Sequence, residues 1–324
     1  MGSCFSADVP AARMDRSPFK FQHQLVGHPA LTIEGLAESL PRLPRDKVMF
    51  SKGLSDLAID FDRAHIDHRN ELSLEQTIET IRTSSSYIAV RDPEDDPAFR
   101  GLYEDLRAEV TDLLRQGGKS RAVYEPRMWL FIASPNAMTP FHFDRYSNFL
   151  MQIRGSKQVA VFPNFRDDIV PNDVCEAYMA REPSVPLWRD ALDLHAEKFD
   201  FQPGDALHIP YIAGHYVKNG AEDVSISLSF FFQTDETLRW SNAMQMNHRL
   251  RKWGRPLGFS PHPVGLSAAR DDMKARLLPA VSGAGAAFHR VRNWLRRKQP
   301  AVGASAMVAM APWVEGPMAA MLGI

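Results

Sequence analysis

The chain has 324 residues, of which 44% are apolar, so it can bury a sizeable hydrophobic core. Its 38 lysines and arginines nearly balance its 39 aspartates and glutamates, which makes recruitment of nucleic acid or of an acidic membrane surface unlikely on charge grounds. The two cysteines give no disulfide framework and no apolar run approaches the length of a membrane span, so we expect a cytoplasmic protein without a transmembrane segment.

The first ninety residues are expected to form a tail followed by short helices and strands. Residues 1–27 mix small, polar and proline residues without a period, which predicts a disordered tail. Residues 31–40 place apolar side chains at helical spacing, with Thr32 as the N-cap. Residues 48–50 begin a strand, and a capping box from Ser73 to Gln76 starts a second helix. Residues 87–90 form the next strand.

The middle of the chain predicts a mainly β domain with helical additions. An apolar stripe of helical period over residues 99–116 indicates a core-packing helix. Short strands with turn signals between them then run from Trp129 to Phe232, which is typical of a double-stranded β-helix or jelly-roll barrel. We expect one catalytic domain over residues 28–235, with its barrel core at about 120–235.

An insertion interrupts the predicted barrel at residues 164–198. It is rich in proline and acidic residues, and long loops in compact domains often have a functional role. We expect substrate selection there, through side chains that include Tyr178, Trp188, Asp190 and Asp193. His195 and Glu197 in the same insertion imitate a metal-ligand pair, but no third ligand accompanies them, so a solvated loop is the favoured interpretation.

The candidate metal ligands are His142, Asp144 and His215. Two imidazoles and one carboxylate are the ligand set of a facial triad, which leaves coordination positions open for a co-substrate and dioxygen. His142 and Asp144 are two residues apart, so they leave the same face of a strand. His215 follows a turn after a second strand, which the Pro-Gly-Asp turn at 203–205 introduces. An isolated H-x-D is common by chance, so the surrounding residues carry the argument.

Lys157 is the strongest of those surrounding residues. Arg154-Gly155-Ser156 is a typical turn sequence between two apolar runs, so we expect a β-hairpin in which Lys157 opens the second strand. Alternation with Val159 and Val161 places this lysine on an apolar face, where its cation needs an anion. The candidate is the distal carboxylate of 2-oxoglutarate, with the Thr139 hydroxyl as a second donor.

Taken together, these residues resemble the JmjC and cupin-like Fe(II)/2-oxoglutarate oxygenases, over about residues 125–235. The closest likeness is to the subgroup that contains the asparaginyl hydroxylase acting on hypoxia-inducible factor. The resemblance implies Fe(II) ligation by the triad and 2-oxoglutarate binding by a further set of residues: Tyr87, Thr139, Asn148, Lys157 and Ser229. Ser229 stands where that hydroxylase has a second asparagine, and Tyr87 is the match for a tyrosine from an earlier strand.

The C-terminal quarter predicts further helices and an apolar tail. Residues 236–298 form a helical region that offers a homodimer contact, and its end is basic and amphipathic. Residues 299–324 repeat Ala, Met, Gly and Pro with a single charge, as in a low-complexity tail.

The predicted activity is hydroxylation of a protein side chain or a small molecule, coupled to oxidative decarboxylation of 2-oxoglutarate. Two alternatives stay open at this point. One is a cupin-type metalloenzyme of another class, such as an isomerase or a dioxygenase that uses Mn or Zn without 2-oxoglutarate. The other is a non-catalytic cupin-like binding module. The prime substrate cannot be read from the sequence.

Overall fold

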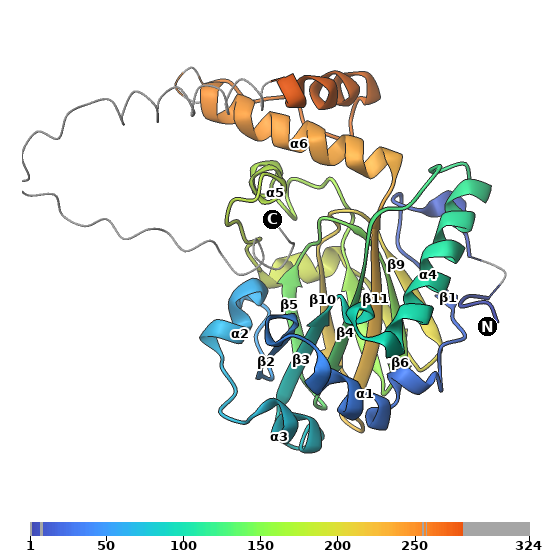
Figure 1. Cartoon of the computed structure of the whole chain (residues 1–324). Coiled ribbons are helices and arrows are strands. Elements are labelled where there is room, and N and C mark those ends of the chain that lie inside the picture. Colours follow the sequence, from blue (N-terminus) through green and yellow to red (C-terminus); the bar gives the residue numbers. More distant parts are fainter. Residues whose placement is uncertain (1, 7–8, 255, 257, 281–324) are drawn as a thin grey trace, which may run out of the picture.

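The computed structural model describes residues 2–6, 9–254, 256 and 258–280, and Figure 1 shows its arrangement. Antiparallel strands form two sheets, one of seven strands in the order β1-β9-β6-β11-β4-β3-β2 and one of four in the order β5-β10-β7-β8. The large sheet contains β1 (Phe19–Gln22), β2 (Val48–Lys52), β3 (Ser86–Arg91), β4 (Tyr124–Ala133), β6 (Ser147–Arg154), β9 (Asp205–Ile209) and β11 (Ser225–Gln233). The small sheet contains β5 (Met138–His142), β7 (Lys157–Val161), β8 (Glu197–Phe201) and β10 (His215–Asn219). This is the mainly β, cupin-like fold class predicted above.

Helices surround the sheets. They are α1 (Ile33–Ser39), α2 (Ala64–Asp67), α3 (Leu74–Glu79), α4 (Pro97–Gln116), α5 (Asn172–Met179), α6 (Asp235–Gly254) and a further helix over 268–280. The predicted N-cap Thr32 accepts a hydrogen bond from the backbone N–H of Gly35, and the capping box between Ser73 and Gln76 is complete. Local side-chain chemistry therefore starts both helices, as expected.

Strand β11 separates two environments by simple alternation. Ile226, Leu228, Phe230 and Phe232 belong to the main hydrophobic core on the outer face of the large sheet. Helix α4 packs on that core through Phe99, Leu102, Leu106, Val110 and Leu114. The intervening residues of β11 point to the opposite face, into the space between the two sheets. The larger sheet thus has an apolar outer face and a partly polar inner face.

The predicted hairpin around Arg154-Gly155-Ser156 is wrong. Strand β6 pairs with β9 and β11 in the large sheet, whereas β7 pairs with β8 and β10 in the small sheet. The turn therefore carries the chain from one sheet to the other. Gly155 has φ +68°, and a Cβ there would overlap the carbonyl oxygen of Val224, so glycine suits this tight crossing.

Residues 2–6 and 9–27 are packed, in contrast to the disordered tail expected for residues 1–27. Strand β1 pairs with β9, and Cys4, Phe5, Met14 and Phe19 are buried in the main core. The sequence conceals this because the apolar residues of the segment follow no single period. Only contacts with distant strands reveal their positions.

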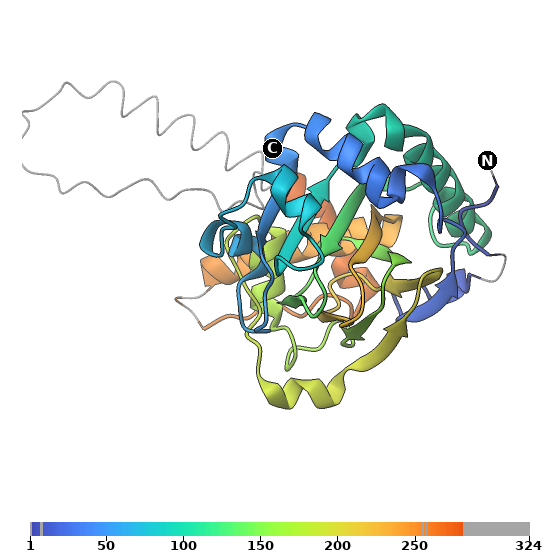
Figure 2. The same cartoon turned by 90° about the horizontal axis from the view of Figure 1, so that it is seen from below.

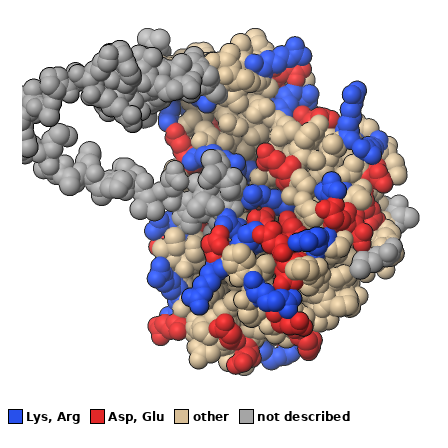
Figure 3. Space-filling model, in the orientation of Figure 1, with Lys and Arg blue, Asp and Glu red and all other residues tan. Residues whose placement is uncertain are grey.

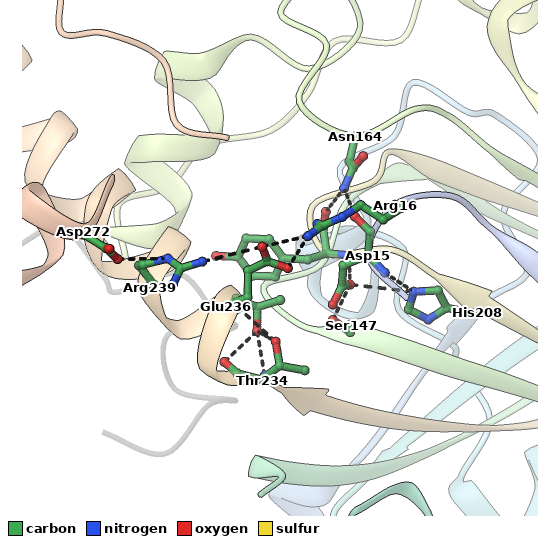
Figure 4. A network of polar contacts seen from close by, with 11 residues as sticks. Asp15, Arg16, Ser147, Asn164, His208, Thr234, Glu236, Arg239 and Asp272 are labelled. Carbon is green, nitrogen blue, oxygen red and sulfur yellow. Dashed lines mark hydrogen bonds and ion pairs between the residues drawn. The ribbon is translucent and has the colours of Figure 1, made fainter. Parts of the chain in front are cut away.

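A polar network fixes the same segment to the sheets and to the C-terminal helices (Figure 4). Buried Asp15 accepts hydrogen bonds from the Ser147 hydroxyl at 2.6 Å and the Tyr211 backbone N–H at 3.0 Å, and its own N–H donates to His208 Nε2. Arg16 binds both oxygens of Glu236 on α6, and Arg239 extends the network to Asp272. His208 is therefore a hydrogen-bonding residue of the interior.

The part of the 164–198 insertion that contains α5 lies beside the C-terminal helices, whereas Trp188 and Asp193 contact Tyr216 on β10. Helix α5 packs against α6 (Figures 1 and 2), and buried Glu176 on α5 binds Asn247 and Arg251 on α6. The predicted end of the helical region at 281–298 and the tail at 299–324 lie outside the described residues. A homodimer contact through these helices stays a prediction.

Charges on the molecular surface are mixed in sign. Figure 3 shows Lys and Arg interspersed with Asp and Glu on the displayed face, in keeping with the near-zero net charge of the chain. Among the helices that the structure describes, none is both long and apolar enough to cross a membrane.

Candidate active site

The three predicted metal ligands meet at one end of the small sheet. His142 closes β5, His215 opens β10, and the two residues are direct partners in the antiparallel register. Asp144 follows β5 by two residues. Ligand atoms from His142, Asp144 and His215 all lie within 4.8 Å of one another. The triad predicted from residues 73 positions apart is therefore brought together by pairing of β5 with β10.

Backbone carbonyls orient both imidazoles. His142 Nδ1 lies 2.7 Å from the carbonyl oxygen of Pro140, and His215 Nδ1 lies 3.0 Å from that of Ala213. A carbonyl accepts only, so each Nδ1 carries the proton and each Nε2 presents its lone pair. A hydrogen bond of this kind to the nitrogen that does not bind metal is the usual support of a histidine ligand.

The charge states of the triad also suit a cation. Burial, with His215 adding to it, holds the pKa of His142 well below its ordinary value, so this imidazole is a neutral ligand. Asp144 Oδ2 is buried without a hydrogen-bond partner and lies 3.5 Å from His215 Nε2. Burial raises the pKa of Asp144, a cost that a bound divalent cation would offset. The donor set and the orphaned oxygen thus fit a divalent transition metal.

A cavity of about 870 Å³, including its open mouth, lies between the sheets and contains the triad in its wall. All five residues predicted to bind the co-substrate line the same cavity: Tyr87, Thr139, Asn148, Lys157 and Ser229. They come from both sheets, on strands β3, β5, β6, β7 and β11. The structure thus brings together every predicted metal ligand and every residue predicted to bind the co-substrate.

Lys157 is a buried cation in this cavity, with 8% of its surface exposed. Its ammonium donates a hydrogen bond to Ser227 Oγ at 2.7 Å, and burial lowers its pKa to about 7. Within the part of the chain that the structure describes, no carboxylate contributes to this pKa. The alternation predicted from Val159 and Val161 holds, since both valines are fully buried beside the lysine.

The other predicted residues form two hydrogen-bonded pairs. The hydroxyls of Tyr87 and Thr139 are 3.3 Å apart, and Asn148 Nδ2 donates to Ser229 Oγ at 3.2 Å. Asn148 Oδ1 is buried without a partner. The shorter reach of serine at position 229 is therefore still sufficient to contact Asn148.

Several cavity residues were not singled out from the sequence. Ser225 and Ser227 line the cavity with Ser229, and the alternation of serines with apolar residues in β11 was the available signal. Phe61 stacks on the His142 ring with centroids 4.8 Å apart. It belongs to the short 3-10 helix Phe61–Arg63, and no pattern in its segment indicates this position.

Residues of the 164–198 insertion divide into two groups. Tyr178 lines the cavity, as expected for a residue that contacts substrate. Trp188 instead packs against Phe141 and Tyr216, and Asp193 accepts hydrogen bonds from Tyr216 and Lys198. His195 and Glu197 are exposed and form no candidate metal site with a third residue of the described chain. Both side chains are thus solvated, but His195 ends the 3-10 helix Asp190–His195 and Glu197 opens β8, so the pair does not lie in the loop that was expected.

Comparison with known proteins places this geometry in a family. Residues 52–237, more than half of the chain, match the model of the cupin-like domain. A curated relative, the JmjC domain-containing protein F of Dictyostelium discoideum, is 30% identical over 175 residues, which is 42% of this chain and 35% of that protein. The chain thus spans about a third of the length of this relative.

The solved structures that are similar to this chain include two of Escherichia coli YcfD, and one of the two is described as a ribosomal oxygenase. They are 13% and 14% identical to this chain, with a TM-score of 0.44 in both cases. Each match covers 86% of this chain and 68% of the YcfD chain.

Proposed function

The chain belongs to the cupin-like domain family, and from this premise we propose that it is an Fe(II)- and 2-oxoglutarate-dependent oxygenase. We propose further that it hydroxylates a protein side chain or a small molecule. The observation that carries the proposal is Lys157, a buried ammonium without a described counter-ion in the same cavity as a two-histidine, one-carboxylate triad.

The triad would hold the metal. His142 and His215 would each offer Nε2, because their Nδ1 atoms are occupied by backbone carbonyls, and Asp144 would offer Oδ2. Three protein ligands leave positions open for a chelating co-substrate and dioxygen. Bound Fe(II) would activate dioxygen, which is the oxidant: one of its oxygen atoms would enter succinate as 2-oxoglutarate loses carbon dioxide, and the other would be inserted into a C–H bond.

Lys157 would bind the distal carboxylate of 2-oxoglutarate. The ammonium is already held by Ser227, and a charge-assisted hydrogen bond to a carboxylate would compensate its burial. Thr139, oriented by Tyr87, would donate a second hydrogen bond, as in the subgroup that contains the asparaginyl hydroxylase of hypoxia-inducible factor. Asn148 and Ser229 would complete the polar wall.

Lys157 and the triad favour this proposal over the two alternatives. A cupin-type metalloenzyme that does not use 2-oxoglutarate has no need for a buried cation in this position. A non-catalytic binding module has no need for three ligand atoms within 4.8 Å of one another, each histidine fixed in the tautomer that suits a metal. A protein or peptide substrate and a small molecule both stay open within the proposal.

Anaerobic spectroscopy tests the proposal directly. Addition of Fe(II) and 2-oxoglutarate to the protein is expected to produce a metal-to-ligand charge-transfer band in the visible range. The band should be lost in Asp144→Ala and should require much more 2-oxoglutarate in Lys157→Met. Absence of the band from wild-type protein that binds iron would refute the proposed function.

A further inference from the structure

Arg145 is a buried arginine in the wall of the same cavity, next to the candidate metal ligand Asp144. It lies in the bend between β5 and β6, and only 7% of its surface is exposed. An arginine is always charged and is rarely buried without partners. Its environment therefore indicates what this part of the cavity is built to bind.

One side of the guanidinium is fixed by Tyr178 of the insertion. Nε donates to the Tyr178 carbonyl oxygen at 2.9 Å, and the guanidinium carbon lies 3.8 Å from the centroid of the Tyr178 ring. The ring in turn packs edge-on against Phe143, with centroids 4.8 Å apart. These contacts hold the guanidinium plane in one orientation.

The other side of the guanidinium is not satisfied. Arg145 Nη1 is buried and has no hydrogen-bond partner in the described protein. A buried donor left unpaired is destabilising, and more so when it is charged. Within the described residues Arg145 also makes no ion pair, so neither its hydrogen-bonding capacity nor its charge is matched by the protein alone.

Nearby charges do not replace the missing partner. Burial lowers the pKa of Arg145 and Arg181 lowers it further, whereas Asp62 raises it. Tyr178 and Tyr146 carry no charge near neutral pH, because burial raises the pKa of both phenols. Burial and Asp60 raise the pKa of Asp62 to about 7, so this carboxyl is partly protonated near neutral pH. Asp62 and Asp144 thus lie near Arg145, but neither is a hydrogen-bond partner of Arg145 Nη1 in the described structure.

An aromatic wall accompanies this charge. Tyr87, Trp129, Tyr146 and Phe231 belong to one buried cluster, and all four line the cavity. Tyr146 directly follows Arg145 in the same bend and is fixed by a hydrogen bond to Glu125 at 3.1 Å. A ligand that reaches Arg145 would therefore lie against apolar and aromatic surface.

Arg145 and Lys157 have separate surroundings. The described partner of Lys157 is Ser227 on β11, whereas those of Arg145 belong to the bend itself and to the insertion. A co-substrate carboxylate that binds Lys157 would thus leave Arg145 Nη1 unpaired. A second acceptor is needed. The metal-chelating end of 2-oxoglutarate and the prime substrate are the two molecules that can bring one, and the charge-transfer band of Arg145→Met distinguishes them.

We propose that Arg145 determines substrate specificity by binding a carboxylate of the prime substrate, and that the substrate is a carboxylic acid with an apolar or aromatic body. The inference rests on the proposed function, since it assigns Arg145 to the prime substrate of that same site. A carboxylate matches the planar fork of the guanidinium and compensates its charge, which a neutral amide does only in part. The body of the substrate lies against the aromatic wall, with the C–H bond to be oxidised near the triad.

Matched probes test this assignment. Protein saturated anaerobically with Fe(II) and 2-oxoglutarate is titrated with 3-phenylpropionate and, separately, with the neutral 3-phenylpropanamide, and binding is measured by calorimetry. The variants are Arg145→Met, which keeps chain length and removes the cation, and Arg145→Lys, which keeps the cation. Arg166→Met on the exposed insertion, where Arg166 pairs with Asp168, is the matched control.

We expect wild type and Arg166→Met to bind the acid at least about tenfold more tightly than the amide. Arg145→Met should lose this preference, and Arg145→Lys should keep part of it. Equal affinity of wild type for acid and amide would overturn the assignment, and so would an unchanged preference in Arg145→Met. The wild-type comparison requires no variant, so it decides the matter even if Arg145→Met does not fold.

The charge-transfer band is recorded on each variant in the same experiment. It should persist in Arg145→Met, because the triad and Lys157 are intact there. Absence of the band from wild-type protein would refute the proposed function. The calorimetric signal does not depend on the band, so it still reports the preference for the acid. Loss of the band in Arg145→Met alone would place Arg145 in the co-substrate site and overturn the assignment.

Discussion

His142 and His215 face each other across β5 and β10, with ring centroids 4.1 Å apart. Two imidazoles this close repel each other when protonated, and the pKa of His142 is accordingly lowered by burial and by His215. Both rings donate from Nδ1 to backbone carbonyls, so both Nε2 atoms are acceptors. Two adjacent acceptors and an unpartnered carboxylate oxygen form an arrangement that a metal ion stabilises.

Removing a ligand of the triad should abolish tight metal binding. We expect Asp144→Ala to weaken Fe(II) binding by more than about a hundredfold, since loss of a supporting partner alone commonly costs 10–100-fold. Anaerobic calorimetry with Fe(II) measures the effect. His195→Ala, which removes an exposed histidine of the H-x-E pair, is the control and should bind as wild type does. Equal binding by Asp144→Ala would exclude Asp144 as a ligand.

Lys157→Met should weaken 2-oxoglutarate binding at least about tenfold while leaving Fe(II) binding within about twofold. The thioether retains most of the apolar volume of the lysine stem but cannot pair with a carboxylate. Lys218→Met is the matched control, because Lys218 is an exposed lysine of the adjacent strand β10. If Lys157→Met weakened the binding of Fe(II) and of 2-oxoglutarate equally, Lys157 would have a structural role.

Binding of 2-oxoglutarate should take up a proton above neutral pH. Burial lowers the pKa of Lys157 from 10.5 to about 7, so the ammonium is largely deprotonated at pH 8 and must regain its proton to pair with a carboxylate. Affinity should therefore fall as the pH rises from 7 to 9. Calorimetry at pH 8 in buffers of different ionisation enthalpy measures the uptake, which should approach one proton and disappear in Lys157→Met.

The same shift predicts how Lys157 affects stability. The unfolded chain holds the lysine proton up to pH 10.5, whereas the folded chain releases it near pH 7. The unfolded state thus binds more protons between these values, and the contribution of Lys157 to the free energy of unfolding rises with pH across this window. In urea denaturation, the free energy of unfolding of Lys157→Met should exceed that of wild type by the largest amount below pH 7. A constant difference between pH 6 and 9 would contradict the lowered pKa.

Asp15→Ala should reduce the free energy of unfolding by about 2 kcal/mol or more, because the Ser147 hydroxyl and the Tyr211 N–H lose a buried acceptor. Asp15 also has φ +57°, which alanine tolerates less well than aspartate. Urea denaturation measures the change. Asp112→Ala, at an exposed position in helix α4, should lie within about 0.5 kcal/mol of wild type. A similar small effect at Asp15 would show that the network contributes little.

Gly155→Ala should destabilise the protein by more than about 1 kcal/mol, because φ is +68° and the new Cβ would overlap the Val224 carbonyl. The control is Gly101→Ala in the exposed middle of α4, where no atom lies within 4 Å of the new Cβ. That change should stabilise by about 0.5–1 kcal/mol through helix propensity. Thermal denaturation of both variants measures these opposite shifts, and a stabilising Gly155→Ala would contradict the crossing turn.

The sequence by itself determined the local chemistry of the protein. Side-chain caps at Thr32 and Ser73 act on backbone groups three residues away, so they can be read from adjacent letters. Alternation along β7 and β11 likewise assigns faces to Lys157 and the serines, because side chains of a strand point alternately to opposite sides. The triad was predictable because few residue types bind a transition metal. The H-x-D spacing of His142 and Asp144, followed by His215 after a second strand, restricted the candidate ligands to these three residues.

Tertiary structure alone decided which strands pair and what each face meets. The Arg154-Gly155-Ser156 turn has the local chemistry of a hairpin, yet its strands belong to different sheets, because pairing depends on distant strands that compete for the same backbone groups. The packing of residues 9–27 likewise depends on β9 and on contacts of Asp15 with residues more than 100 positions away. Arg145 reads as an ordinary charged residue beside an H-x-D motif, and only the folded chain buries it with one nitrogen unpaired.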